Sequence, residues 1–248
     1  MRYSHFFLCL ASLFLCITSV ADEIYRAEYT GQYRGLNVTT YRSLNELKPG
    51  QFQYRFHVDH ALAKLDESSD FIFSTKGELL PLRYIMEKKV FGFTTTEKLS
   101  FDWEQKIASY SHSKKKKRNG TVALKPGILD PLLHQLALQE DLSRSDTTLD
   151  YHFIKRTSNK NYLFERVSEE NIDVGGETYS AILIERSNIK ESKNLQMWFV
   201  PALDYQLGKI RYQEKDGDEY ELRLVKYTVE PERLQQWRDS REQLMTKQ

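Results

Sequence analysis

The chain has 248 residues, with 36 lysines and arginines against 35 aspartates and glutamates, so its formal net charge is +1. This balance gives no overall positive field, which argues against nucleic acid or an anionic membrane as a partner held by charge alone. Both cysteines, Cys9 and Cys16, lie near the start of the chain.

The first predicted element is a cleavable signal peptide over residues 1–21. An apolar run from Phe6 to Val20 follows a charged start, and small residues at Ser19 and Ala21 fit the groove of a signal peptidase. The run has 15 residues, fewer than the roughly 20 that span a bilayer as a helix. We therefore expect cleavage after Ala21 and export to the periplasm, with an uncleaved anchor as the alternative.

Lipidation at Cys16 is a second alternative, but Leu15 stands where lipoprotein processing requires a small residue. Cleavage after Ala21 would remove both cysteines, so the mature chain would contain no thiol. That excludes disulfides, cysteine nucleophiles and thiolate metal sites from the mature protein. It would also remove Arg2, which leaves 35 basic and 35 acidic residues.

Most of the remaining chain predicts β-strands. Polar and apolar residues alternate from Ile24 to Tyr29, and Phe52, Tyr54, Phe56 and Val58 follow at a period of two. Similar runs continue to residue 112. The five cations of Lys114–Arg118 then precede Asn119-Gly120, a pair that predicts a type I′ hairpin with the cations at its exposed tip.

One helix is expected to interrupt the strands. Asp130-Pro131 offers an N-cap acceptor followed by a proline at the first helical position, and leucines recur at helical spacing after it. This pattern predicts a short helix from Pro131 to Asp141.

Strands resume at Leu149. Gly175-Gly176 predicts a two-residue hairpin, and the nearly apolar run from Tyr179 to Glu185 predicts a strand covered on both faces. From Pro231 onward the pattern changes to a charged, amphipathic helix. We therefore predict a single antiparallel β domain over residues 22–230, with eleven to fourteen strands, and a charged helical tail over residues 231–248.

Two segments resemble a known family, the domain of unknown function numbered 3108. They are Leu129-Asp130-Pro131-Leu132-Leu133, opening the helix, and Met197-Trp198-Phe199-Val200-Pro201. The opening at residues 23–40 is also similar. Leu133 departs from the usual serine, and Leu207 departs from a common second proline. The resemblance covers Tyr25 to Tyr227.

This resemblance implies an exported envelope protein of Gram-negative bacteria. It also implies a mainly β fold: a strongly curved antiparallel sheet, a half-barrel or open barrel similar to periplasmic lipoprotein carriers. It implies no activity or ligand, because neither is established for the family.

No catalytic, cofactor or metal motif emerges from the residues. His57-x-x-His60 is the one close histidine pair, and residues three apart on a strand point to opposite faces. The acidic groups, which include Asp66-Glu67, Glu169-Glu170 and Asp216-Gly217-Asp218-Glu219, are explained by turns, and the histidines by surface or edge positions. Lys114–Arg118 offers a contact for lipopolysaccharide phosphates, against the simpler interpretation of a solvated tip.

The aromatic residues are the weak candidates for a ligand site. Trp103, Trp198, Phe199 and Tyr205 fall on predicted strands, where a concave sheet face could hold an acyl chain; an ordinary core is the alternative. The leading hypothesis is a non-enzymatic periplasmic carrier or binding protein for a lipidic or hydrophobic ligand, with the helix as a lid. The alternatives are an envelope scaffold, acting on a protein partner through sheet edges or Pro231–Gln248, and an envelope hydrolase.

Overall fold

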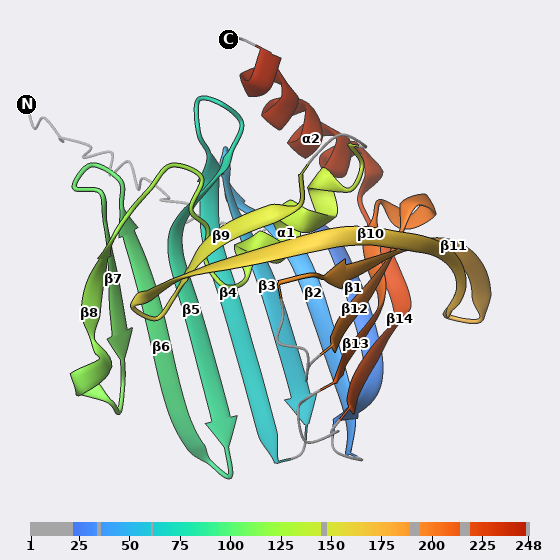
Figure 1. Ribbon diagram of the computed structural model, residues 1–248, viewed down its shortest axis with the longest axis horizontal. Helices are drawn as coiled ribbons and strands as arrows, with labels where there is room; N and C mark the ends of the chain where they lie inside the picture. Colours follow the sequence, from blue (N-terminus) through green and yellow to red (C-terminus); the bar gives the residue numbers. More distant parts are fainter. Residues whose placement is uncertain are drawn as a thin grey trace, which may run out of the picture.

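The computed structural model describes residues 22–33, 36–60, 62–144, 148–188, 194–213 and 219–246. The predicted signal peptide, its cleavage site and Cys16 lie outside these residues. Within them, fourteen strands form one antiparallel sheet that closes into a nearly complete barrel, accompanied by two α-helices (Figure 1). The mainly β, curved-sheet prediction is confirmed.

The first eight strands form an uninterrupted meander, because each pairs with the next along the chain. They are β1 (Asp22–Tyr33), β2 (Leu36–Lys48), β3 (Gln51–His60), β4 (Ala63–Phe73), β5 (Leu79–Val90), β6 (Phe93–Asp102), β7 (Ile107–His112) and β8 (Gly120–Ala123). A single turn of 3₁₀ helix, η1 (Lys116–Arg118), connects the last two.

The remaining six strands form a second meander that joins the first through one long-range pairing, β14 with β1. They are β9 (Asp150–Lys155), β10 (Ser158–Val174), β11 (Glu177–Arg186), β12 (Asn194–Val200), β13 (Gln206–Gln213) and β14 (Glu219–Val229). A second 3₁₀ turn, η2 (Pro201–Leu203), precedes β13. The sheet therefore runs from β8 through β1 and β14 to β9.

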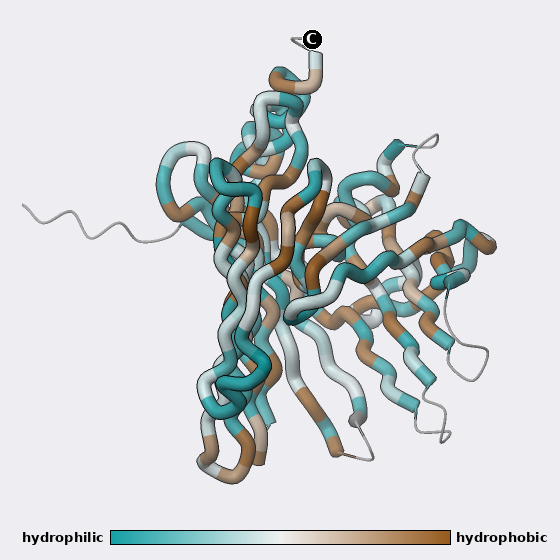
Figure 2. The backbone as a smooth tube through the Cα atoms, turned by 60° about the vertical axis from the view of Figure 1, so that its left-hand side comes forward, coloured by the Kyte–Doolittle hydropathy of each residue, from teal (hydrophilic) through white to brown (hydrophobic). Residues whose placement is uncertain are grey.

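The concave face carries the core. Alternate residues of β1, including Tyr25, Ala27 and Tyr29, are buried, as the period of two predicted. The run from Ala181 to Ile184 is buried on both faces of β11, which lies between β10 and β12. Figure 2 shows the resulting alternation of apolar and polar residues along the strands.

Helix α1 (Leu133–Asp141) connects the two meanders and lies across the concave face (Figure 1). Leu133, Leu136 and Leu138 are among its fully buried side chains. The helix begins two residues later than predicted. Asp130 is nevertheless its N-terminal acceptor, because one carboxylate oxygen accepts hydrogen bonds from the backbone N–H groups of Leu132 (2.8 Å) and Leu133 (2.7 Å).

Helix α2 (Pro231–Thr246) packs against one end of the sheet. Leu234 and Trp237 are buried, and the Trp237 ring lies 5.7 Å from that of Phe73 and 6.3 Å from that of Phe52. The described part of the tail is thus a packed element of the domain. Neither described α-helix combines the length and the apolar character needed to cross a bilayer.

The two predicted hairpins have different outcomes. Gly175 and Gly176 both have positive φ between β10 and β11, as a type I′ turn requires. The type I′ prediction at Asn119-Gly120 is wrong, because Asn119 has a φ of −63°. Its side-chain oxygen instead accepts the backbone N–H of His112, which supports a wider connection containing η1.

Candidate functional site

Two adjoining cavities remain on the concave face beside α1. The central cavity, of about 400 Å³, lies against α1, and the end cavity, of about 460 Å³, lies toward the β1–β2, β3–β4 and β5–β6 hairpins. Inward residues two apart on one strand line different cavities: Arg42 and Thr40 on β2, and Glu67 and Leu65 on β4. Because such residues are neighbours on one sheet face, the cavities are consecutive parts of one groove.

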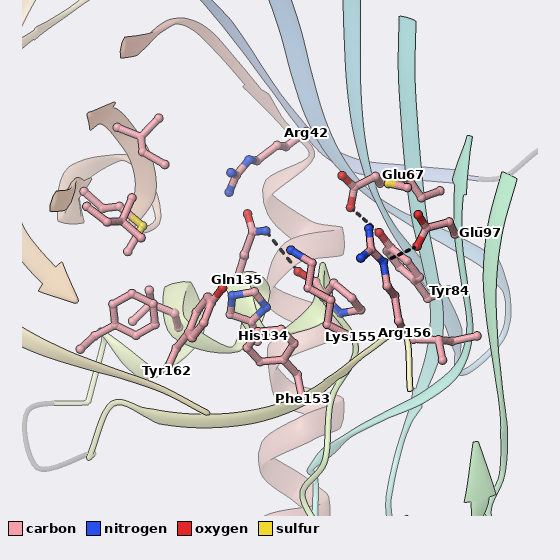
Figure 3. A pocket seen from close by; sticks show the side chains of 18 of the residues that line it. Arg42, Glu67, Tyr84, Glu97, His134, Gln135, Phe153, Lys155, Arg156 and Tyr162 are labelled. Carbon is pink, nitrogen blue, oxygen red and sulfur yellow. Dashed lines mark hydrogen bonds and ion pairs between the residues drawn. The ribbon is translucent and has the colours of Figure 1, made fainter. Parts of the chain in front are cut away.

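The central cavity contains five charged side chains. Arg42, Lys155 and Arg156 provide the cations, and Glu67 and Glu97 provide the anions. Figure 3 shows Arg42 extending into the cavity from one wall, while Glu67, Glu97 and Arg156 gather on the other. The wall of this cavity is therefore positively charged overall when both glutamates are ionised.

Both glutamates accept hydrogen bonds from tyrosine hydroxyls. Tyr84 donates to Glu67 (2.8 Å), and Tyr110 donates to Glu97 (2.8 Å), which also pairs with Arg156 (3.5 Å). Burial raises the pKa of Glu67, although the hydrogen bond from Tyr84 opposes that shift. Burial and the neighbouring glutamate raise the pKa of Tyr84 as well, so its hydroxyl stays a donor at neutral pH.

His134, on α1, forms the floor of the central cavity. Its ring stacks on Phe153 at 4.4 Å and meets Tyr162 edge-on at 5.4 Å. Burial lowers its pKa to about 3, so the imidazole is neutral at physiological pH. The expectation of surface or edge histidines is wrong for His134 and His112, which are both buried.

The side chains that could bind a metal ion do not cluster in the described part of the chain. His57 pairs with Asp66 across β3 and β4 (2.6 Å). Among the described residues, no three histidine, cysteine, aspartate or glutamate side chains converge as a metal ion would require.

The end cavity differs from the central one in having a mostly apolar wall, with Lys64 and Lys88 as its charged lining residues. Its wall is formed mainly by Val38, Phe56, Val58, Leu65, Val90 and Leu222. Leu62 and Phe91 lie at the hairpin ends that border it, with 52% and 71% of their surfaces exposed. Figure 2 shows apolar residues extending to these ends of the strands. Exposed side chains of this size at the edge of an apolar cavity are typical of a ligand entrance.

The aromatic residues selected from the sequence lie in different places. Phe199 lines the central cavity. Its neighbour Trp198 points to the opposite face of β12, where it donates to Glu170 (2.9 Å) and lies 4.4 Å beneath the Lys209 ammonium group.

The other two lie outside the regular strands. Trp103 follows β6, donates to the Pro81 carbonyl (2.7 Å) and stacks on Phe101 at 6.3 Å. Tyr205, in the turn after η2, has a φ of 57° and packs against the core. The structure thus brings one of the four to a cavity wall.

Sequence reasoning missed the polar residues of the central cavity. One signal was available for Arg42: it occupies an inward position between Thr40 and Leu44, where the alternation calls for an apolar residue. Glu67 occupies an equivalent position between Leu65 and Ser69, so the interpretation of Asp66-Glu67 as an acidic turn is wrong: both residues lie within β4. A charged residue at an inward strand position indicates either a buried pair or a ligand contact.

The Asp130-Pro131 segment anchors α1 to the sheet. One Asp130 oxygen caps the helix, and the other accepts a hydrogen bond from the Ser69 hydroxyl of β4. Asp130 is fully buried, and burial raises its pKa to about 6. This anchor holds Pro131, His134 and Leu138 in the wall of the central cavity.

Comparison with known proteins supports the family resemblance seen in the sequence around Asp130-Pro131 and Met197–Pro201. The model of a family described as "Protein of unknown function (DUF3108)" matches residues 25–225. No curated protein matches the chain.

Proposed function

The chain belongs to the DUF3108 family, and from the geometry of its concave face we propose that it is a non-enzymatic periplasmic carrier or binding protein for a lipidic or other hydrophobic ligand. The end cavity is the observation that carries this proposal. It has about 460 Å³ of space, a mostly apolar wall, and exposed apolar side chains where it meets the hairpin ends. That volume lies within the range of small-molecule sites. Water finds no hydrogen-bond partners in an apolar cavity, so such a cavity readily binds an apolar molecule.

The periplasm is part of the proposal because the first 21 residues have the pattern of a signal peptide. Native mass spectrometry with lipid extraction, on protein taken from the periplasm, tests both parts together. We expect a bound lipid on chains that begin at Asp22. Protein that retains Met1 and is found in the cytosol would contradict the location, and protein without any bound lipid would count against the ligand.

A cavity-filling variant makes the ligand test specific. Val58 lines the end cavity, so Val58→Trp should occupy the space and abolish binding of an environment-sensitive fluorescent fatty-acid analogue. Val167→Trp is the matched control, because Val167 is exposed on β10. Equal binding by the two variants would place the ligand elsewhere.

The Glu67–Glu97 wall favours a hydrolase as the second candidate. Two carboxylates facing one cavity, one of them with a raised pKa, are the groups that acid–base hydrolysis requires. Release of product from ester or glycoside substrates, abolished by Glu67→Gln, would establish this function. A panel of such substrates left intact by the wild-type protein would argue for the carrier.

The scaffold alternative gains less from the structure. The inner face of α2 already packs on Phe52 and Phe73, and Arg238 pairs with Asp204 (3.0 Å) and Glu140 (3.3 Å). The tail therefore has a role within the domain, and only its outer face remains for a partner.

A further inference from the structure

Arg42 is a buried cation without an anionic partner. Only 9% of its surface is exposed, and among the described residues its guanidinium forms no ion pair, although its charge favours the ionised form of Glu67. The guanidinium carbon instead lies 5.4 Å from the ring centre of Phe56 and 5.9 Å from that of Tyr29. Burying a charge costs free energy, and a guanidinium does not lose its proton in a protein, so Arg42 cannot avoid that cost by becoming neutral. Buried charges of this kind are ordinarily paired.

Buried hydroxyl groups without hydrogen-bond partners surround the same position. Thr40 precedes Arg42 on the same face of β2, and its hydroxyl has no partner in the described structure. The Tyr29 hydroxyl is likewise buried and without a partner there, whereas the Tyr54 hydroxyl is a hydrogen-bond partner of the Arg42 guanidinium. Unsatisfied buried polar atoms are rare in folded proteins, and two of them beside one cation indicate a place for an oxygen-rich group.

Arg42 also lies at the boundary between the two cavities. Its side chain lines the central cavity, while Phe56, beneath its guanidinium, lines the end cavity. A chain that entered at Phe91 and followed the apolar wall would therefore bring its head group to Arg42. Lys155 lines the same central cavity and adds a second cation.

We propose that the natural ligand is an anionic amphiphile, with its apolar chain in the end cavity and a carboxylate or phosphate head bound by Arg42. This inference rests on the proposed carrier function and specifies its ligand. The head would accept hydrogen bonds from the guanidinium, in the charge-assisted geometry that favours carboxylates and phosphates. The hydroxyl of Thr40, which lines the end cavity, would supply a further donor.

The test uses the full-length mature protein and four ligands with the same twelve-carbon chain: laurate, dodecyl phosphate, dodecanol and dodecyltrimethylammonium, all below their micellar concentrations. Competition against a fluorescent fatty-acid analogue gives each dissociation constant. We expect the two anions to bind at least about 10-fold more tightly than the alcohol, because each forms a charge-assisted contact. The cation should bind most weakly. The order of laurate and dodecyl phosphate then identifies the preferred head.

Variants at Arg42 connect the preference to that residue. Arg42→Met should lose the preference for anions and still bind dodecanol, whereas Arg42→Lys should retain part of it. Lys155→Met, at a less buried position, is a second variant in case Arg42→Met does not fold, and it should weaken both anions. Circular dichroism establishes the folding of each variant.

The two proposals fail in different ways. If the four ligands bind equally well, or if the alcohol binds best, the anionic head is refuted and the carrier function stands. If none of them binds, both are refuted. A preference for anions that survives intact in folded Arg42→Met would refute the assignment to Arg42.

Discussion

Replacement of Trp237 tests whether the tail helix is part of the folded core. Only 2% of its surface is exposed, and its ring contacts Phe52 and Phe73. Truncating a buried tryptophan to alanine costs about 3–5 kcal/mol in lost burial and cavity formation. The indole N–H is buried without a partner in the described structure, so its removal returns about 1 kcal/mol. We expect Trp237→Ala to lower the free energy of unfolding by about 2–4 kcal/mol.

Urea denaturation followed by circular dichroism measures this loss without relying on tryptophan fluorescence. Trp237→Phe keeps most of the apolar volume and also removes the unpaired N–H, so its loss should stay below about 1.5 kcal/mol. Gln236→Ala, at an exposed position of α2, is the matched control and should lie within about 0.5 kcal/mol of the wild type. A Trp237→Ala protein as stable as the Gln236→Ala control would mean that α2 does not pack on the sheet in solution.

Three further predictions concern stability. Burial lowers the pKa of His134 in the folded protein to about 3, below its ordinary 6.5. Its contribution to the free energy of unfolding is therefore complete above pH 6.5 and is lost as the pH falls toward 3. In an acid titration, His134→Phe should unfold at a lower pH than the wild type. Asp130 has the opposite sign: its folded pKa of about 6 exceeds 3.8, so its contribution declines as the pH rises from about 4 to 6. Urea titrations across that range should show a smaller decline for Asp130→Asn than for the wild type. Gly31→Ala would place a Cβ 1.9 Å from the Glu221 carbonyl oxygen and should lower the free energy of unfolding by at least about 2 kcal/mol. Gly50→Ala, with a φ of 76° and open space around it, should lower it by about 1 kcal/mol. Similar losses for the two variants in urea titrations would contradict the β1–β14 pairing.

The strands were predictable because their signal is local. Alternation along β3 and the paired glycines between β10 and β11 depend on neighbouring residues alone. The same holds for Asp130 as the acceptor at the N-terminus of α1, although the helix itself begins two residues later than predicted. The Asn119-Gly120 prediction failed because a side-chain contact, from Asn119 to His112, determined the turn in place of the intrinsic preference of the pair.

The candidate site was not predictable because it depends on pairings between distant parts of the chain. Arg42 belongs to the first meander, and Lys155 and Phe199 belong to the second. Only the pairing of β1 with β14, together with the connection through α1, places these residues around one space. The abundance of aromatic residues directed attention to Trp198, but a residue's face on a strand depends on register. Trp198 and Phe199 are adjacent and therefore point to opposite faces.

The Asp130-Pro131 segment, which carries part of the family resemblance, also determines the shape of the central cavity. Asp130 binds the first turn of α1 and the Ser69 hydroxyl of β4 with different oxygens, so it fixes both the start of the helix and its position on the sheet. With that start, Leu133 and Leu136 fill the core, and His134 and Leu138 face the central cavity. A start one residue later would rotate the helix by about 100° relative to the sheet, because successive residues are spaced by that angle. The residues that now fill the core would then turn away from it, so the capping aspartate determines how much of the groove α1 occupies and how much stays open to a ligand.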